Sequence, residues 1–185
     1  MAEQTSPTRP SASFDVEDTQ LIFNEENNID DMYLTFGVST EEYGIGIRYV
    51  TEIIGMQRVM EVPDVPAFIK GVINLRGKVI PVMDVRNRFQ MEAIDYTERT
   101  VIVVLDVDAV PIGLIVDNVR EVMEIPPDRI DHPPQFGAHR EGGSVIQGLG
   151  KQGERVAILL DVQRLLSEQV IDLQSTLNTA AQMPV

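Results

Sequence analysis

Residues 71–79, GVINLRGKV, are the part of the sequence that most resembles a phosphate-binding loop. Such a loop has a glycine, four residues, a second glycine, a lysine and then serine or threonine. Its amides bind the phosphates and its hydroxyl binds magnesium. Here five residues separate Gly71 from Gly77, and Val79 follows Lys78 where the hydroxyl should stand. The spacing excludes a nucleotide-binding loop of this type.

Other residue types that carry out catalysis are few and poorly placed. His132 and His139 both fall in a connection rich in proline and glycine. The local sequence offers no partner that could orient either imidazole for catalysis. We interpret them as exposed loop residues rather than as catalysts or metal ligands. Asp84 and Asp161 could be paired carboxylates, but each ends an apolar run, so we interpret both as helix N-caps. We therefore predict no catalytic residue, no metal site and no cofactor.

The charge balance of the chain restricts the class of partner. The 185 residues include 29 acidic and 15 basic ones, a formal net charge of −14. An acidic surface repels nucleic acid, because phosphate backbones are bound by clustered Lys and Arg, and it repels anionic lipid as well. The longest apolar runs, such as residues 101–105, are far shorter than the roughly 20 residues that span a bilayer. With no signal peptide and no cysteine, we expect a cytoplasmic protein.

The elements that must position any functional residue are mostly short strands. Runs rich in Val and Ile, broken by Gly, Pro and Asp, predict strands at 33–38, 43–47, 78–83, 101–107, 111–116 and 155–160. One helix is predicted at 161–173, with Asp161 as its N-cap. This pattern favours an all-β barrel or sandwich.

The two ends of the chain differ from this pattern. Residues 1–31 are polar and acidic, which predicts a mobile tail, and residues 167–185 are predicted to hold the end of the helix and a second tail. The one apolar cluster of the first tail is Leu21, Ile22 and Phe23, which leaves a docking peptide as the alternative to a solvated arm.

An internal repeat organises the rest of the chain. KGVINLRGKVIPVMDVRNRF, from residue 70, aligns with QGLGKQGERVAILLDVQRLL, from residue 147, with a constant offset (161 − 84 = 77). Upstream, Val50 aligns with Val119 and Glu52 with Glu121 (121 − 52 = 69). The repeat segments are about 44–89 and 113–166. Since so small a β unit is marginally stable by itself, we expect two similar barrels that share a core and meet along a seam.

Within the first copy, Arg76 is a candidate contact residue at the tip of a predicted turn. If residues 73–76 form a tight turn, Asn74 and Gly77 supply the turn chemistry and Arg76 stands at the tip beside an apolar surface. Glu52 is a plausible partner for its guanidinium, and such pairs are frequent interface anchors. The alternative is that Arg76 is a solvated charge and Gly71 an ordinary turn residue.

A family resemblance rests on these same residues. VPDVPAFIKGVINLRGKVIPVMDVRNRF resembles the signature of the CheW family of chemotaxis coupling proteins, and YGIGIRYVTEII and PIGLIVDNVREVM continue the match over residues 32–166. The resemblance implies two intertwined SH3-like five-stranded β-barrel subdomains around a shared core, with a short C-terminal helix. It also implies a non-enzymatic adaptor that couples methyl-accepting chemoreceptors to a regulatory barrel domain of the histidine kinase CheA, at receptor arrays on the inner face of the membrane.

The resemblance further implies two groups of contact residues. Receptor contacts are expected at Arg76, Glu52, Val101 and Val122, the two valines lining a seam that accepts a helical hairpin. Kinase contacts are expected at Val50, Lys70 and Gly71 on the surface of the first barrel. Two other functions remain open: a paralogue that serves a different array, for pilus motility or surface sensing, and a β-barrel that binds a small molecule.

Overall fold

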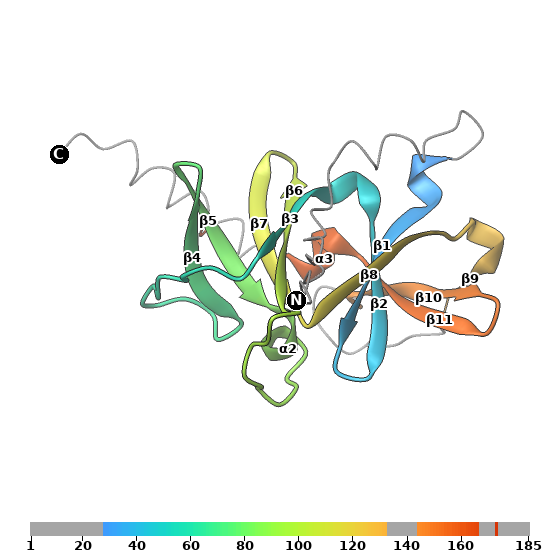
Figure 1. Ribbon diagram of the computed structural model, residues 1–185. Helices are drawn as coiled ribbons and strands as arrows, with labels where there is room; N and C mark the ends of the chain where they lie inside the picture. Colours follow the sequence, from blue (N-terminus) through green and yellow to red (C-terminus); the bar gives the residue numbers. More distant parts are fainter. Residues whose placement is uncertain (1–27, 133–143, 167–172, 174–185) are drawn as a thin grey trace, which may run out of the picture.

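The chain forms two β lobes that lie side by side (Figure 1). The computed structural model describes residues 28–132, 144–166 and 173. Lobe 1 is a five-stranded sheet with the order β3-β6-β7-β5-β4, and lobe 2 is a six-stranded sheet with the order β8-β1-β2-β11-β10-β9. The strands are β1 Met32–Val38, β2 Glu41–Gly46, β3 Val50–Gly55, β4 Ile69–Leu75, β5 Lys78–Asp84, β6 Val101–Val107, β7 Val110–Val116, β8 Asn118–Glu124, β9 Ile130–Asp131, β10 Ile146–Gln152 and β11 Arg155–Leu160. The expected all-β fold of two subdomains is confirmed, with the two-residue β9 added at one edge of lobe 2.

The two copies of the repeat exchange strands reciprocally. The offset of 69 also relates β1 to β6 and β2 to β7 (101 − 32 = 110 − 41 = 69), which extends the two copies toward the N-terminus. Strands β1 and β2 of the first copy lie in lobe 2, while β6 and β7 of the second copy lie in lobe 1. The parallel pairing of Val82 with Gly113 joins β5 to β7, and that of Leu159 with Gly44 joins β11 to β2. These two pairings are equivalent (159 − 82 = 77 and 113 − 44 = 69). The two lobes are therefore related by an approximate two-fold symmetry, and each needs strands from both copies.

Three apolar clusters hold the lobes. One lies inside lobe 1 and includes Ile73 and Ile102, and a second lies inside lobe 2 and includes Met123 and Leu159. The third and largest combines side chains of both sheets, and we call it the shared core; among its buried members are Leu34, Phe36, Ile45, Met83, Leu105, Leu114 and Leu160. Full burial of each such side chain is worth about 1.5–3 kcal/mol. The expectation that the two barrels share a core is confirmed.

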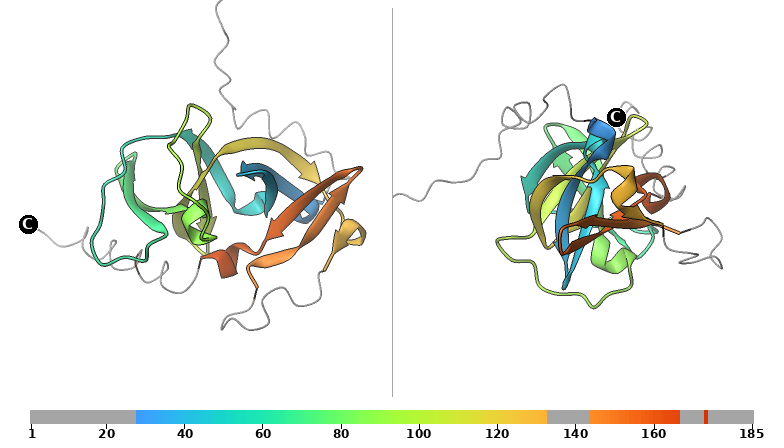
Figure 2. Two further views of the ribbon diagram at one scale, coloured as in Figure 1. Left: turned by 90° about the horizontal axis from the view of Figure 1, so that it is seen from below. Right: turned by 90° about the vertical axis from the view of Figure 1, so that its right-hand side faces the viewer.

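Strand β6 shows why the sequence has continuous apolar runs instead of clean alternation. Ile102 and Val104 face the interior of lobe 1, whereas Val103 and Leu105, which alternate with them, face the shared core. Since successive side chains of a strand point to opposite faces, both faces of β6 are covered and both demand apolar residues. Figure 2 shows this strand in the middle of the molecule, where the two lobes meet.

Two short helices follow equivalent strands, α2 Val85–Arg88 and α3 Val162–Leu165. The Asp84 carboxylate accepts hydrogen bonds from the first amides of α2, and Asp161 accepts one from the Arg164 N–H in α3, so both predicted N-caps are confirmed. Helix α3 ends at Leu165, and its C-cap Leu166 has a ψ of 75°, so the predicted continuous helix at 161–173 is wrong at this point. Leu173 packs against the shared core. Residues 167–172 lie outside the described residues, as do the tail at 1–27, the 21–23 cluster and residue 139. No helix in the part of the chain that is described is long and apolar enough to cross a membrane.

Candidate protein-interaction site

The turn that carries Arg76 is shorter than the sequence predicted. Strand β4 continues to Leu75 and β5 begins at Lys78, so Arg76 and Gly77 alone form the turn, with φ values of 51° and 85°. Two positive φ values match the hairpin turn that follows the twist of the strands. The Asn74 Oδ1 accepts a hydrogen bond from the Gly77 N–H at 2.9 Å, so both residues that were expected to supply the turn chemistry take part in the turn. The predicted turn at 73–76 is wrong in position, because residues 73–75 still pair with β5.

Arg76 and Glu52 form the predicted ion pair. The Nη1–Oε1 and Nη2–Oε2 distances are both 2.8 Å, so the guanidinium binds the carboxylate through two parallel hydrogen bonds. These bonds lower the pKa of Glu52. Glu52 lies on β3 and Arg76 on the turn after β4, and these strands are the two edges of the lobe 1 sheet. The pair therefore bridges the open side of this barrel, and the guanidinium remains largely exposed.

Gly71 has an internal reason to be glycine. It is buried in a bulge of β4, with a φ of +146°. A Cβ atom there would lie 2.0 Å from the main-chain oxygen of Met60. That oxygen accepts a hydrogen bond from the Val72 N–H, which joins the 56–62 segment to the edge of β4. The expectation that Gly71 lies on the barrel surface is therefore wrong, because its backbone packs against its own chain.

Lys70 and Val50, which the sequence grouped with Gly71, occupy different surroundings. Lys70 is exposed on the edge strand β4, and its Nζ lies 5.9 Å from the centroid of the Tyr96 ring. Val50 is half-buried at the start of β3 and packs against the shared core. The structure thus groups Val50 with the seam residues Val101 and Val122, which are half-buried and pack against the same core.

Two further seam residues were not singled out from the sequence. Ile53 on β3 and Val119 on β8 are half-buried and also pack against the shared core. The repeat could have found them, because Val119 is the counterpart of Val50, and Val122 is the counterpart of Ile53 (119 − 50 = 122 − 53 = 69). We call Val50, Ile53, Val101, Val119 and Val122 the seam; its members come from β3, β6 and β8.

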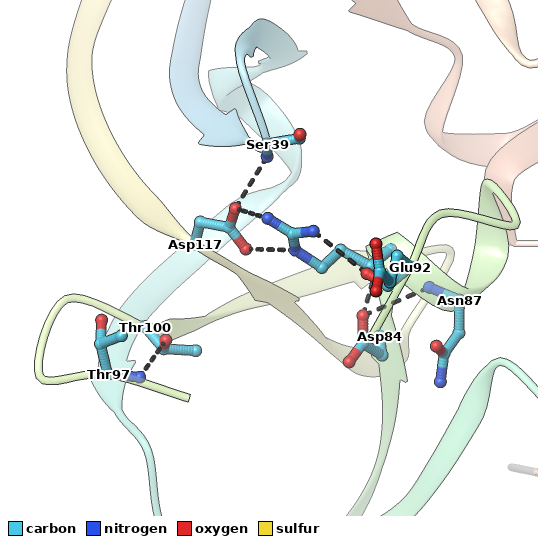
Figure 3. A network of polar contacts seen from close by, with 8 residues as sticks. Ser39, Asp84, Asn87, Glu92, Thr97, Thr100 and Asp117 are labelled. Carbon is cyan, nitrogen blue, oxygen red and sulfur yellow. Dashed lines mark hydrogen bonds and ion pairs between the residues drawn. The ribbon is translucent and has the colours of Figure 1, made fainter. Parts of the chain in front are cut away.

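A polar network links the two lobes around Asp117 (Figure 3). The Arg86 guanidinium of α2 donates to both oxygens of Asp117, at 2.9 and 2.5 Å, where the chain passes from β7 in lobe 1 to β8 in lobe 2. The Ser39 N–H, from the β1–β2 turn, donates to the same carboxylate at 2.7 Å. Burial raises the pKa of Asp117, but the hydrogen bonds from Arg86 and Ser39 outweigh it, and the pKa is lowered. The network ties elements of both lobes at one point.

The histidine that the structure describes has no catalytic surroundings. His132 is exposed just after β9, and its Nδ1 lies 3.2 Å from the main-chain oxygen of Gln147. Within residues 28–132, 144–166 and 173, no group of three or more His, Cys, Asp or Glu side chains could hold a metal ion. Asp84 and Asp161 act as helix caps.

Comparisons with known proteins agree with this architecture. The family model described as CheW-like domain matches residues 32–170. A chemotaxis protein CheW of Klebsiella aerogenes is 39% identical over 141 residues, which cover 76% of this chain and 84% of that protein. A chemotaxis protein CheW of Treponema pallidum is 31% identical over 149 residues, covering 78% and 86%. The crystal structure of the scaffolding protein TtCheW from Thermoanaerobacter tengcongensis superposes with a TM-score of 0.68 at 29% identity, covering 76% of this chain and 95% of that one.

Proposed function

The chain belongs to the CheW-like domain family, and on that premise we propose that it is a non-enzymatic adaptor that couples methyl-accepting chemoreceptors to the histidine kinase CheA. Support comes from relatives named for chemotaxis and from a similar structure described as a scaffolding protein. The observation that carries the proposal is the seam, where apolar side chains of both lobes remain half-exposed over the shared core. A helical hairpin is recognised by such an apolar trough.

The receptor hairpin packs on the seam, with Val101 and Val122 as apolar contacts and Arg76 and Glu52 as the charged contact at its side. The Arg76 guanidinium suits this role because Glu52 fixes its orientation while most of its surface stays open. The receptor tips lie on the inner face of the membrane, and the adaptor acts there within the receptor array.

The kinase binds lobe 1, with two contacts: the exposed Lys70 and Val50, which is the seam residue at the start of β3. Gly71 contributes indirectly, because its bulge sets the course of the edge strand and of the 56–62 segment that pairs with it. A barrel domain of the kinase can pack against such an edge. We place the folded module at residues 32–166, close to the extent of the family match, with tails at 1–31 and 167–185.

Co-sedimentation of the full chain with receptor-containing membranes and CheA tests the proposal. The wild-type chain should associate with each partner alone and should raise kinase activity when both are present. Arg76→Ala should lose receptor association and keep CheA association, whereas Arg129→Ala, an exposed arginine in lobe 2, should behave as wild type. A folded chain that binds neither partner would contradict the proposal. Recovery of a different kinase from native cells would assign the adaptor to another array.

A further inference from the structure

The seam has an internal two-fold relation that its neighbouring charges share. Val50 and Ile53 of β3 are the counterparts of Val119 and Val122 of β8, and all four pack against the shared core. Glu52 stands between the first two residues as Glu121 stands between the second two (121 − 52 = 69). Glu52 on the lobe 1 side of the seam and Glu121 on the lobe 2 side therefore occupy equivalent positions.

Glu121 also has an arginine partner. The Arg155 Nη1 donates to the Glu121 Oε1, and the Arg155 Nη2 donates to the Glu42 Oε1 at 2.6 Å. Arg155 is the first residue of β11 and corresponds to Lys78 (155 − 78 = 77), whereas the counterpart of Arg76 is Gly153. An arginine–glutamate bridge therefore recurs in lobe 2 although the arginine stands two residues later in the repeat.

The two bridges differ in which of their charges reach solvent. In lobe 1 the Arg76 side chain is 73% exposed and Glu52 only 23%, so the cation faces solvent. In lobe 2 the Glu121 side chain is 52% exposed and Arg155 is 42% exposed, and the buried Glu42 pairs with both Arg155 and the partly exposed Arg120. An exposed carboxylate therefore stands among partly exposed arginines on the lobe 2 side of the seam, whereas the lobe 1 side presents mainly a guanidinium.

We propose that Glu121, held by Arg155, is a second charged contact for the receptor hairpin and that it determines the orientation in which the hairpin binds. The inference rests on the proposed receptor function. Because the apolar residues of the seam are related by a two-fold axis, they contact a hairpin almost equally well in either of two opposite orientations. The unlike charges discriminate, because only one orientation brings an acidic residue of the hairpin to Arg76 and a basic residue to Glu121.

The test uses the full chain and a receptor cytoplasmic fragment that contains the hairpin tip, with affinity measured by isothermal titration calorimetry. Glu121→Gln removes the charge and keeps the side-chain shape, and we expect about two- to fivefold weaker binding with a smaller dependence on salt, as for one exposed ion pair. Glu124→Gln, an exposed site on the same strand, is the matched control and should leave the affinity unchanged. CheA affinity should not change in either variant.

Charge reversal identifies the contact on the hairpin. Glu121→Lys should weaken binding further, and replacing one particular Lys or Arg of the hairpin by Glu should restore it. If the wild-type chain binds the fragment and Arg76→Ala weakens that binding, while Glu121→Gln matches Glu124→Gln and no hairpin reversal rescues Glu121→Lys, the inference is overturned and the proposed function stands. If the folded wild-type chain does not bind the fragment at all, both fail.

Discussion

Replacing Gly71 by alanine should destabilise the fold far more than an ordinary glycine-to-alanine change in a strand. The new Cβ would lie 2.0 Å from the Met60 oxygen and 2.7 Å from the Met60 carbonyl carbon. Both atoms belong to the main chain, so no side-chain rotation can relieve the contact. The φ of +146° is a conformation that residues with a Cβ rarely adopt.

The size of the effect follows from two terms. Holding alanine at this φ costs about 1–3 kcal/mol. Relieving the clash also moves the 56–62 segment aside, which breaks the two hydrogen bonds between Met60 and Val72, both 2.8 Å long, at about 0.5–1.5 kcal/mol each. The two terms together lower the free energy of unfolding of Gly71→Ala by about 2–6 kcal/mol, a large share of the roughly 5–15 kcal/mol typical of a domain.

Urea unfolding followed by circular dichroism measures this change as a lower midpoint with an unchanged slope. Two matched variants separate the causes. Gly77→Ala has a φ of +85° but no atom within 4 Å of the new Cβ, so it should cost only about 1 kcal/mol of backbone strain. Gly55→Ala meets no atom within 4 Å and has no positive φ, so it should change little. If Gly71→Ala unfolds at the same urea concentration as Gly55→Ala, the clash argument is refuted.

Four further variants test the polar contacts by the same urea measurement. Asp117→Asn should lower the free energy of unfolding by about 2 kcal/mol at pH 7. The destabilisation caused by this substitution should become smaller as the pH falls below 3.8, the ordinary pKa of an aspartate carboxyl. The pKa of Asp117 is lowered in the folded protein, so at low pH protonation removes the stabilisation that the Asp117 carboxylate gives the wild-type protein. A destabilisation that grows in acid would contradict this. Tyr96→Phe should cost about 1 kcal/mol, since the Tyr96 O–H donates to the Asp84 Oδ2 at 2.8 Å, and no change would mean that water replaces it. Asp84→Ala should cost about 2 kcal/mol and Asp161→Ala about 1 kcal/mol, because Asp84 is buried and has more donors; the reverse order would count against the capping argument.

Much of the fold could be predicted because its apolar runs and its repeat are long-range signals. A run such as 101–105 is apolar throughout, and the repeat predicted a shared core. The reciprocal exchange of strands could not be predicted from the repeat, since equivalent sequences pair equally well within one copy or across two, and only the family resemblance implied intertwined subdomains. Gly71 was misjudged for a related reason: the atom that excludes a side chain there belongs to Met60, in a segment with no periodic pattern.

The candidate site was predicted in part. Glu52 and Arg76 stand out as unlike charges beside apolar runs, and their ion pair follows from that arrangement. Glu121 was aligned with Glu52, but its own bridge was hidden because the alignment places Gly153, and not an arginine, opposite Arg76. A side chain as long as arginine spans a shift of two residues, so an ion pair can be retained in space when it is lost from the alignment.

The exchange of strands bears directly on how an adaptor of this kind can act. The seam lies where β3 and β8 meet the shared core, and the lobes on either side are joined by that core and by the contacts of Asp117 with Arg86 and Ser39. Swinging one lobe away from the other would break these polar contacts and expose buried side chains such as Phe36 and Leu105. A partner therefore meets a seam that is already formed, and its binding energy is not used to order it. It follows that such an adaptor couples its partners by fixing their relative placement, with lobe 1 and the seam as two faces of one rigid body.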